Sequence, residues 1–144
     1  MVILLDTNII LDHLILRKPF SDTAESILRL CYEEKCEGYI AAHTITNIFY
    51  ILRKHFSIES RKKMLIELCE FINVAGIQRK QIVDALMNED FDDVEDRLQV
   101  ECATKINASY IVTRNVSDFI ASPIPAIQPV DFLALITEGN NAAE

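Results

Sequence analysis

The sequence predicts a single α/β domain in which helices pack against a central, mostly parallel β-sheet. Short apolar, β-branched runs alternate with longer stretches whose apolar residues recur at the helical spacing. The chain has 144 residues, half of them hydrophobic. This length can bury a core without disulfides but cannot form two independent cores. We find no repeat or Gly-rich linker that would divide the chain.

The first elements follow from an apolar run, a cap and a proline. Val2–Leu5 is continuously apolar, as expected of a strand buried on both faces. The polar residues Asp6, Thr7 and Asn8 can cap a helix that begins near Ile9. Lys18–Asp22 contains a proline, which ends this helix before another begins at Ser21 or Asp22.

The middle of the chain repeats this alternation. Gly38–Ala41 predicts a second strand, and helical spacing of apolar residues resumes from Thr44. A further helix is expected where Met64, Leu68 and Ile72 share one face. The predicted strand after it covers Val74–Ile77.

The last third has the same organisation and ends in a polar tail. A helix around Ile82–Met87 and an acidic connector precede a longer helix, and a buried β-branched strand follows. Pro129 is well placed to open the last helix. The remaining predicted elements are a helix over Val94–Ile106, strands over Tyr110–Thr113 and Ala126–Ile127, a helix from Pro129 to near Ile136, and a frayed tail over residues 137–144.

Composition excludes several classes of protein. Apolar runs such as Val2–Leu5 fall far short of the roughly 20 residues that cross a bilayer, so no membrane association is expected. The start of the chain lacks the pattern of a secretory signal. The four cysteines form no C-x-x-C pair and have no His at zinc-finger spacing, which favours reduced, buried thiols. We therefore expect a cytoplasmic protein.

Carboxylates at the predicted strand ends are the best candidates for chemistry. In parallel sheets, ligand sites form outside the carboxyl ends of the strands. Asp6 follows the first strand, Asp118 follows the strand at Tyr110–Thr113, and Asp96 lies in the first turn of the helix before that strand. If they converge, their mutual repulsion raises at least one pKa unless a cation neutralises them. Mg²⁺ or Mn²⁺, which prefer oxygen ligands, suit such a site.

Helical spacing separates the acids around Asp96. Asp96 shares a helix face with Val100 and Ala103 and should therefore point toward the sheet, while Glu95 is a second candidate. Asp92 and Asp93 are expected to stabilise the helix N-terminus. Side chains that can support the site with hydroxyl or amide groups are Thr7, Asn8, Thr113 and Asn115.

Other catalytic patterns are missing from the sequence. We find no P-loop, no dinucleotide fingerprint and no nucleophile elbow. His13, His43 and His55 lie among helical residues, where surface or structural roles are expected. A phosphoacceptor receiver or an Asp-nucleophile phosphatase remains an alternative, but the phosphatase requires a second Asp where Asn8 stands, and the receiver requires a Lys after a late strand, where none is found.

These motifs resemble those of PIN-domain ribonucleases, the family that includes the VapC-type toxins of bacterial toxin–antitoxin pairs. The resemblance extends from Val2 to about Leu133. It rests on the order and spacing of four segments: Leu4–Asp12, Thr44–Lys54, Val94–Gln99 and Ile111–Phe119. It implies a PIN-like three-layer α/β/α sandwich over residues 1–136 with four or five strands. It also implies Mg²⁺- or Mn²⁺-dependent hydrolysis of RNA, with Asp6, Asp96 and Asp118 as catalytic and metal-binding acids.

The chain departs from the family pattern at Asn47, where many members have a glutamate. An amide offers one neutral oxygen and cannot act as a base. Thr46 and Asn47 are equally compatible with capping the first turn of their helix. Two functions remain open: an active metal-dependent endoribonuclease, the toxin of a toxin–antitoxin pair, or a catalytically weakened RNA- or protein-binding module.

The acidic net charge of −8 does not exclude RNA, because the charges are unevenly distributed. Seven of the 22 acidic residues lie between Glu89 and Glu101, whereas five basic residues lie between Arg53 and Lys63. We expect Arg53 and Lys54 to contact RNA and Arg114 to hold a phosphate. The expected partners are single-stranded or structured RNA, a basic antitoxin segment that docks at the acidic site, and a second copy of the chain.

Overall fold

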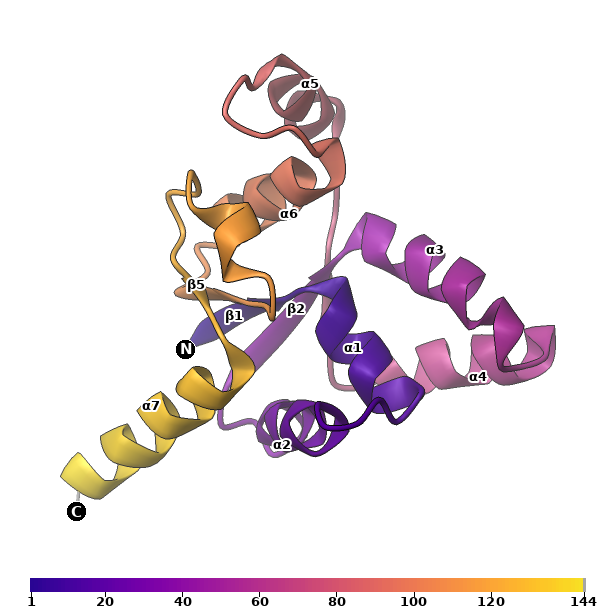
Figure 1. The fold of residues 1–144 in the computed structure, drawn as a ribbon, viewed down its shortest axis with the longest axis vertical. Helices are drawn as coiled ribbons and strands as arrows, with labels where there is room; N and C mark the ends of the chain where they lie inside the picture. The colour runs from indigo at the N-terminus through magenta and orange to yellow at the C-terminus, as the bar shows by residue number, and fades with distance from the viewer. Residues whose placement is uncertain (144) are drawn as a thin grey trace.

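The computed structural model describes residues 1–143, so Glu144, the last residue of the predicted tail, lies outside the described residues. A five-stranded parallel sheet forms the centre of the fold (Figure 1). From one edge to the other, the strands are β3 (Asn73–Ala75), β2 (Glu37–Ala41), β1 (Val2–Leu5), β4 (Tyr110–Val112) and β5 (Ala126–Ile127). The prediction of an α/β/α fold with a mostly parallel sheet of four or five strands is confirmed.

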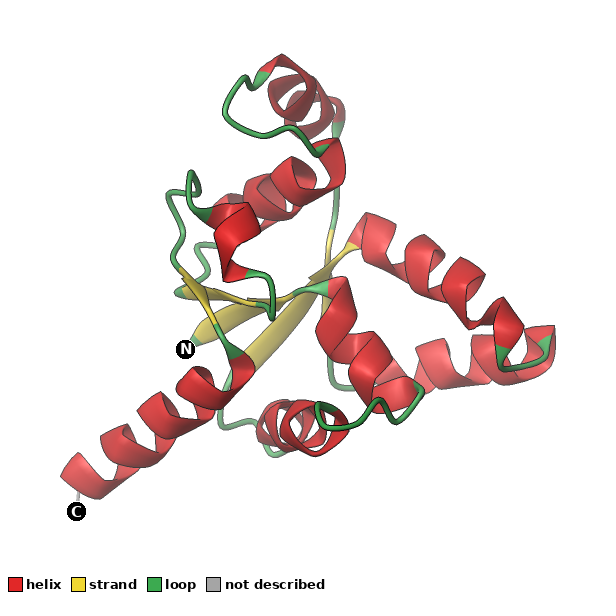
Figure 2. Ribbon diagram, in the orientation of Figure 1, coloured by secondary structure: helices red, strands yellow, loops and turns green. Residues whose placement is uncertain are grey.

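Helices cover both faces of this sheet (Figure 2). One face carries α1 (Thr7–Leu14), α2 (Ser21–Tyr32), α3 (Ala42–Ile51), the short turn η1 (Leu52–Lys54), α4 (Ile58–Leu68) and α7 (Pro129–Ala142). The other face carries α6 (Val94–Lys105) and the short turn η2 (Val116–Phe119), and α5 (Arg79–Met87) packs on the outside of α6.

The alternation of side chains along β1 explains the two cores. Ile3 and Leu5 belong to the cluster under α1, α2 and α7, whereas Leu4 points the other way and belongs to the cluster with Val100 of α6 and Phe119 of η2. All three β1 side chains are fully buried. A strand buried on both faces has no polar positions, which is why Val2–Leu5 is continuously apolar.

The order of the strands places a ligand-binding crevice at one position. From β1, the chain continues to β2 and β3 on one side of the sheet, and later to β4 and β5 on the other. The carboxyl ends of β1 and β4 are therefore the point where the winding direction reverses, and α/β sheets bind ligands at such points. Asp6 and Thr113 follow these two strand ends directly, and the Asp6 amide donates to the Val112 carbonyl at 3.0 Å.

Several predicted boundaries were wrong by a few residues. The first helix begins at Thr7 rather than near Ile9, because Asp6 is extended and occupies the N-cap position. The third strand covers Asn73–Ala75, and the last helix continues past Ile136 to Ala142. The polar residues between Ile136 and Ala142 are exposed, so their polarity predicted the loss of a buried face but not the end of the helix.

Within residues 1–143, no helix combines the length and apolar character that a membrane crossing requires. All four cysteines are free thiols, and Cys31, Cys36 and Cys102 are buried whereas Cys69 is exposed.

Gly38 of β2 should be intolerant of a side chain. A Cβ at this position would lie 2.6 Å from Cys31 Sγ and 3.0 Å from Ile72 Cδ1, both in the core. We expect Gly38→Ala to lower the free energy of unfolding by about 1–3 kcal/mol, measured by urea denaturation. Gly76→Ala is the control, because a Cβ there meets nothing within 4 Å and should change stability by less than about 1 kcal/mol. Equal effects of the two substitutions would contradict this account.

Candidate active site

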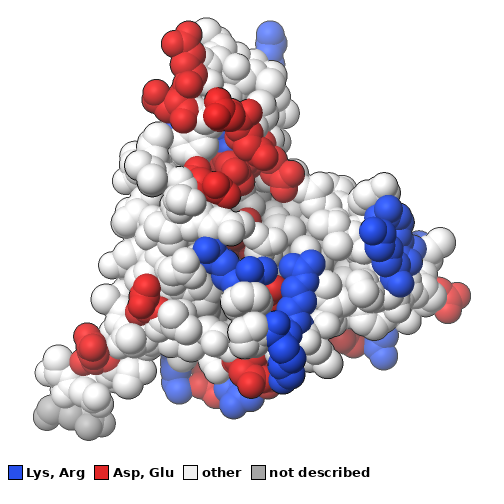
Figure 3. Space-filling model, in the orientation of Figure 1, with Lys and Arg blue, Asp and Glu red and all other residues white. Residues whose placement is uncertain are grey.

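A cleft of about 310 Å³ opens at the carboxyl end of β1, between α1 and α3 on one side and the start of α6 on the other. Within the described residues 1–143, no Lys, Arg or His side chain lines it. The lining residues are Asp6, Thr7, Asn8, Leu11, Asn47, Tyr50, Ile51, Asp93, Glu95, Asp96 and Asn115. In Figure 3, acidic side chains gather over α5, α6 and their connector, and basic side chains gather over the lower part of the molecule.

Asp6 forms the floor of this cleft. Its side chain does not cap α1, which corrects the capping role that the sequence suggested. Instead, Thr113 Oγ1 donates to Asp6 Oδ2 at 2.8 Å, and Gln99 Nε2 donates to Asp6 Oδ1 at 3.2 Å. Only 7% of Asp6 is exposed. The carboxylate is thus fixed by hydrogen bonds from β4 and α6.

Burial raises the pKa of Asp6 above its ordinary value. The hydrogen bonds from Thr113 and from the Thr7 backbone lower this pKa, whereas the negative charges of Glu95 and Asp118 raise it. The carboxyl group therefore lies within the electrostatic field of at least two other acids.

Asp96 lies in the first turn of α6 and points into the same cleft. Burial, followed by the negative charges of Asp93, Asp6, Asp118 and Glu95, raises its pKa to about 7. The amides of Glu95 and Asp96 both hydrogen-bond to Asp93 Oδ1, so Asp93 caps α6 as the sequence predicts. No positive side chain is among the groups that shift the pKa of Asp96.

Asp118 and Asn115 come from the segment after β4. Asp118 is exposed in η2, and its charge raises the pKa of both Asp6 and Asp96. Asn115 lines the cleft, and its amide donates to Thr113 Oγ1 at 2.9 Å. Because Thr113 is fully buried and its hydroxyl is bonded to Asp6, it positions the carboxylate from behind.

Asn47 lies in the middle of α3, so the alternative in which it caps the first turn of this helix is wrong. Its side-chain amide instead donates to Glu95 Oε1 across the cleft at 2.7 Å. Thr46 Oγ1 donates to the His43 carbonyl within the helix. Burial and the charge of Asp93 raise the pKa of Glu95, and the hydrogen bond from Asn47 lowers it.

The donor set of the cleft fits a hard divalent cation in its chemistry. It offers carboxylate, amide and hydroxyl oxygens, together with an excess of negative charge that the lining leaves uncompensated. Burial lowers the pKa of the nearby His43, which favours its neutral form. Among residues 1–143, no three acidic, His or Cys side chains stand close enough together to hold one ion. Because hydrogen bonds fix Asp6, the other carboxylates must turn toward it to ligate a metal.

Two residues near the cleft were not predicted from the sequence. Gln99, which holds Asp6, is 1% exposed and follows Asp96 by three residues on the same helix face. Asp12 is 1% exposed and forms a bidentate ion pair with Arg114, at 2.7 and 3.0 Å. A polar residue on an otherwise apolar helix face was the available signal in both cases.

The basic residues expected to contact RNA lie in different environments. The Arg114 guanidinium is paired with Asp12 and lies 4.0 Å from the centre of the Phe20 ring. Arg53 and Lys54 are exposed, and the Arg53 guanidinium lies 3.7 Å from the ring centre of Tyr50, a residue that lines the cleft.

Arg61, one of the five basic residues between Arg53 and Lys63, does not lie on the surface. This residue is buried and donates to the Phe49 carbonyl at 2.8 Å. Its guanidinium also lies 4.3 Å from the centre of the Phe49 ring. Arg61 therefore joins α4 to α3 in the interior.

Comparisons with known proteins give a family from the sequence and a fold from solved structures. A sequence model of the PIN domain matches residues 2–117, and no curated protein sequence matches the chain. The solved structure of VapBC2 from Rickettsia felis, bound to a promoter DNA fragment, superimposes with a TM-score of 0.66 at 18% identity, covering 89% of this chain and 98% of that one.

Two further solved structures are similar. VapC20 from Mycobacterium tuberculosis, described as a Sarcin–Ricin loop cleaving toxin, gives a TM-score of 0.65 at 13% identity over 85% of this chain and 95% of that one. VapBC-1 from nontypeable Haemophilus influenzae gives a TM-score of 0.63 at 19% identity, covering 90% of this chain and 99% of that one. At these identities, the likeness concerns the fold.

The raised pKa of Asp96 predicts how stability depends on pH in metal-free buffer. The folded state binds the proton more tightly than the unfolded chain, whose aspartate has the ordinary pKa of 3.8. Stability should therefore fall as pH rises from about 4 to about 7. Asp96→Asn should weaken this dependence and be more stable than wild type near pH 8, by about 1 kcal/mol at most because solvent screens the group.

Denaturation curves at several pH values test this expectation. Asp92→Asn is the control, because Asp92 is exposed and does not line the cleft. A pH profile of Asp96→Asn that runs parallel to that of the wild type would show that Asp96 carries no perturbed pKa.

Proposed function

The chain belongs to the PIN domain family, and on this premise we propose that it is a metal-dependent endoribonuclease that hydrolyses RNA phosphodiester bonds in the acidic cleft. The observation that carries the proposal is the convergence of Asp6 and Asp96. They come from different elements and line the same cleft at the switch point of the sheet, and the charge of Asp6 raises the pKa of Asp96 with no positive side chain to offset it. Groups with perturbed pKa values in a cleft are typical of active sites.

Asp6, Asp96 and Asp118 would hold the metal in this proposal. Bound Mg²⁺ or Mn²⁺ polarises a phosphodiester and makes a bound water more acidic. Thr113 and Gln99 keep Asp6 in one orientation, so its oxygens need little reorganisation when substrate binds. Asn8 and Asn115, which line the cleft, offer amide groups that can orient a water or a phosphate oxygen.

RNA would reach the acids along the α3 side of the cleft. Tyr50 is 62% exposed there, and the Arg53 guanidinium covers its ring. An exposed aromatic ring stacks on an unpaired base, and an adjacent cation contacts the backbone phosphates. Lys54 adds a second exposed positive charge next to Arg53. Arg114 would assist only indirectly, because Asp12 already holds its guanidinium.

We further propose that the protein is the toxin of a toxin–antitoxin pair and acts in the cytoplasm. The similar structures include VapBC complexes and a toxin described as cleaving the Sarcin–Ricin loop, which supports a structured RNA as substrate and an antitoxin as partner. A basic antitoxin segment would be attracted to the uncompensated acids of the cleft. Association with a second copy of the chain stays a prediction.

A second candidate is a binding module that has lost catalysis. The amide at Asn47 and the lack of a ready-made group of three acids among residues 1–143 favour it. Such a module would bind RNA or protein without requiring metal and without turnover. Cleavage assays with and without EDTA separate the two candidates.

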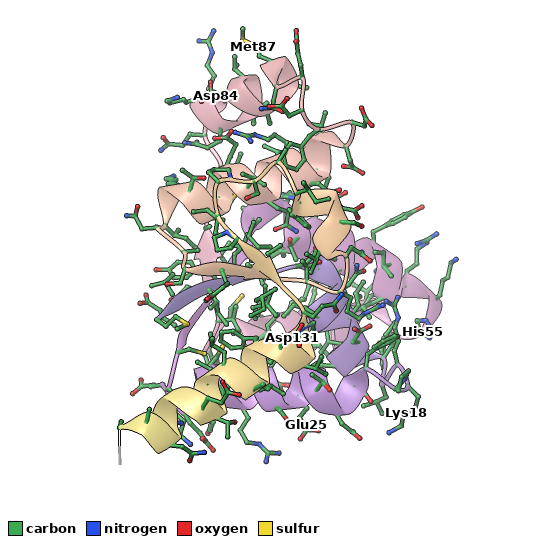
Figure 4. The ribbon with its side chains drawn as sticks, turned by 60° about the vertical axis from the view of Figure 1, so that its left-hand side comes forward. Lys18, Glu25, His55, Asp84, Met87 and Asp131 are labelled. Carbon is green, nitrogen blue, oxygen red and sulfur yellow. The ribbon has the colours of Figure 1, made fainter. Side chains whose placement is uncertain are left out.

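Removing either central carboxylate should abolish cleavage. We expect Asp6→Asn and Asp96→Asn each to reduce Mn²⁺-dependent RNA cleavage by at least about 100-fold, because losing even an outer-shell partner of a metal costs about 10- to 100-fold. Asp131→Asn is the control, since Asp131 is exposed on α7 and lies outside the cleft lining (Figure 4). Cleavage is followed on gels with and without EDTA. Full activity in both cleft variants would exclude the proposed mechanism.

The exposed cations near Tyr50 should contribute to RNA affinity but not to metal binding. We expect the Arg53→Gln/Lys54→Gln double variant to bind RNA more weakly. The logarithm of the RNA association constant decreases with the logarithm of the salt concentration. The magnitude of this slope should be smaller by about 0.7 for each RNA phosphate that these side chains no longer neutralise. Lys35→Gln is the control because Lys35 precedes β2, at the amino end of the sheet. Salt titrations monitored by fluorescence anisotropy test this, and equal slopes for all three proteins would place the RNA elsewhere.

A further inference from the structure

We propose that Glu95 is an additional metal-binding carboxylate of the cleft, positioned by Asn47, so that this pair performs the task of an acidic side chain on α3. The inference rests on the proposed function, because it concerns the same site. In this arrangement, Glu95 of α6 supplies a carboxylate to the α3 side of the cleft, where α3 itself has none. It also accounts for Asn47 without assuming loss of activity.

The sides of the cleft differ in the acids that they contribute. The floor contributes Asp6 from the end of β1, the start of α6 contributes Glu95 and Asp96, and Asp118 of η2 stands within electrostatic reach. By contrast, the α3 side is lined by Asn47, Tyr50 and Ile51, none of which is charged. A metal held only from the floor and from α6 would therefore lack a carboxylate on its α3 side.

The hydrogen bond from Asn47 directs Glu95 toward that side. The Asn47 Nδ2 atom lies 2.7 Å from Glu95 Oε1, and the bond joins the middle of α3 to the first turn of α6. Among the hydrogen bonds of residues 1–143, only one of the two Glu95 side-chain oxygens takes part. The other oxygen remains available to a ligand, as in metal sites where a second group orients a ligating carboxylate.

The chemistry of the two side chains is complementary. An amide can donate a hydrogen bond to a carboxylate, whereas a second carboxylate at position 47 would repel the first. The pair thus brings one negative charge, not two, to the α3 side of the cleft. One acid and one amide are also present if the two residues exchange positions. A variant with the two side chains exchanged therefore tests the role of the pair.

A nearby polar atom also lacks a partner. Gln99 Oε1 is buried without a hydrogen bond, although the Nε2 atom of the same side chain is bonded to Asp6. A buried oxygen without a donor is costly in a native protein. A metal-bound water is one group that could donate to it, so this atom is consistent with a hydrated ion near Asp6 and independent of the Asn47–Glu95 bond.

The experiment measures Mn²⁺ affinity directly, by electron paramagnetic resonance of the free ion, in the full-length protein. We expect Glu95→Gln to weaken Mn²⁺ binding by about 10- to 100-fold, the range typical of groups that hold or orient metal ligands. Glu89→Gln is the matched control. Glu89 is exposed in the same acidic segment, but it does not line the cleft, so Mn²⁺ affinity should stay within about twofold.

The exchange variant Asn47→Glu/Glu95→Gln distinguishes a carboxylate ligand from a structural bridge. It keeps an acid and an amide at the two positions, so we expect it to recover at least about tenfold of the affinity that Glu95→Gln loses. Asn47→Ala, which keeps Glu95 but frees it, should show an intermediate affinity. Circular dichroism and thermal denaturation of each variant identify any that fail to fold.

The outcomes separate this inference from the proposed function. Mn²⁺ binding and RNA cleavage by the wild type, with Glu95→Gln indistinguishable from Glu89→Gln, would overturn the role of Glu95 alone. A folded exchange variant that binds as weakly as Glu95→Gln would overturn the equivalence of the two positions. A wild type that neither binds Mn²⁺ nor cleaves RNA would instead overturn the proposed function.

Discussion

The hydrogen-bonded burial of Asp6 is the constraint on which the arrangement of the site depends. A carboxylate that is almost fully buried is costly unless donors satisfy its oxygens. Here the donors are the hydroxyl of Thr113 and the amide of Gln99, which come from the end of β4 and from α6. The pairing of β4 with β1 and the packing of α6 against the sheet are therefore also requirements of the site. The same two contacts set the direction in which Asp6 presents its charge.

The parts of the fold that the sequence could predict are those whose signals lie in consecutive residues. The β1 strand and the helix after Asp93 were predictable because an apolar run and an N-cap are written in consecutive residues. The place of Asp6 in the cleft was predictable from a general rule about strand ends, and that of Asp96 from the helix face that it shares with Val100 and Ala103. The end of α7 was not, because polar residues after Ile136 are compatible with both an exposed helix and a coil.

Long-range side-chain partners could not be predicted from one sequence. The Asn47–Glu95 hydrogen bond joins residues 48 positions apart, and the burial of Arg61 depends on a carbonyl acceptor on another helix. Neither partner carries a local pattern that selects it. In the sequence, Asn47 therefore suggested that an acid is missing from α3. In the structure, its amide holds the carboxylate of Glu95 at the cleft.

The position of Arg114 shows how the fold keeps positive charge away from these acids. Arg114 directly follows Thr113, whose hydroxyl touches Asp6, so its guanidinium starts close to the cleft along the chain. Asp12 removes it by a bidentate ion pair on the other side of α1, where Phe20 also covers the guanidinium. A buried carboxylate such as Asp12 is unfavourable without a cation, and Arg114 makes the shorter of its two ion pairs, at 2.7 Å against 3.5 Å for Arg17. The ion pair thus leaves the negative charge of Asp6, Asp96 and Glu95 uncompensated by protein, which is the electrostatic condition that a divalent cation requires.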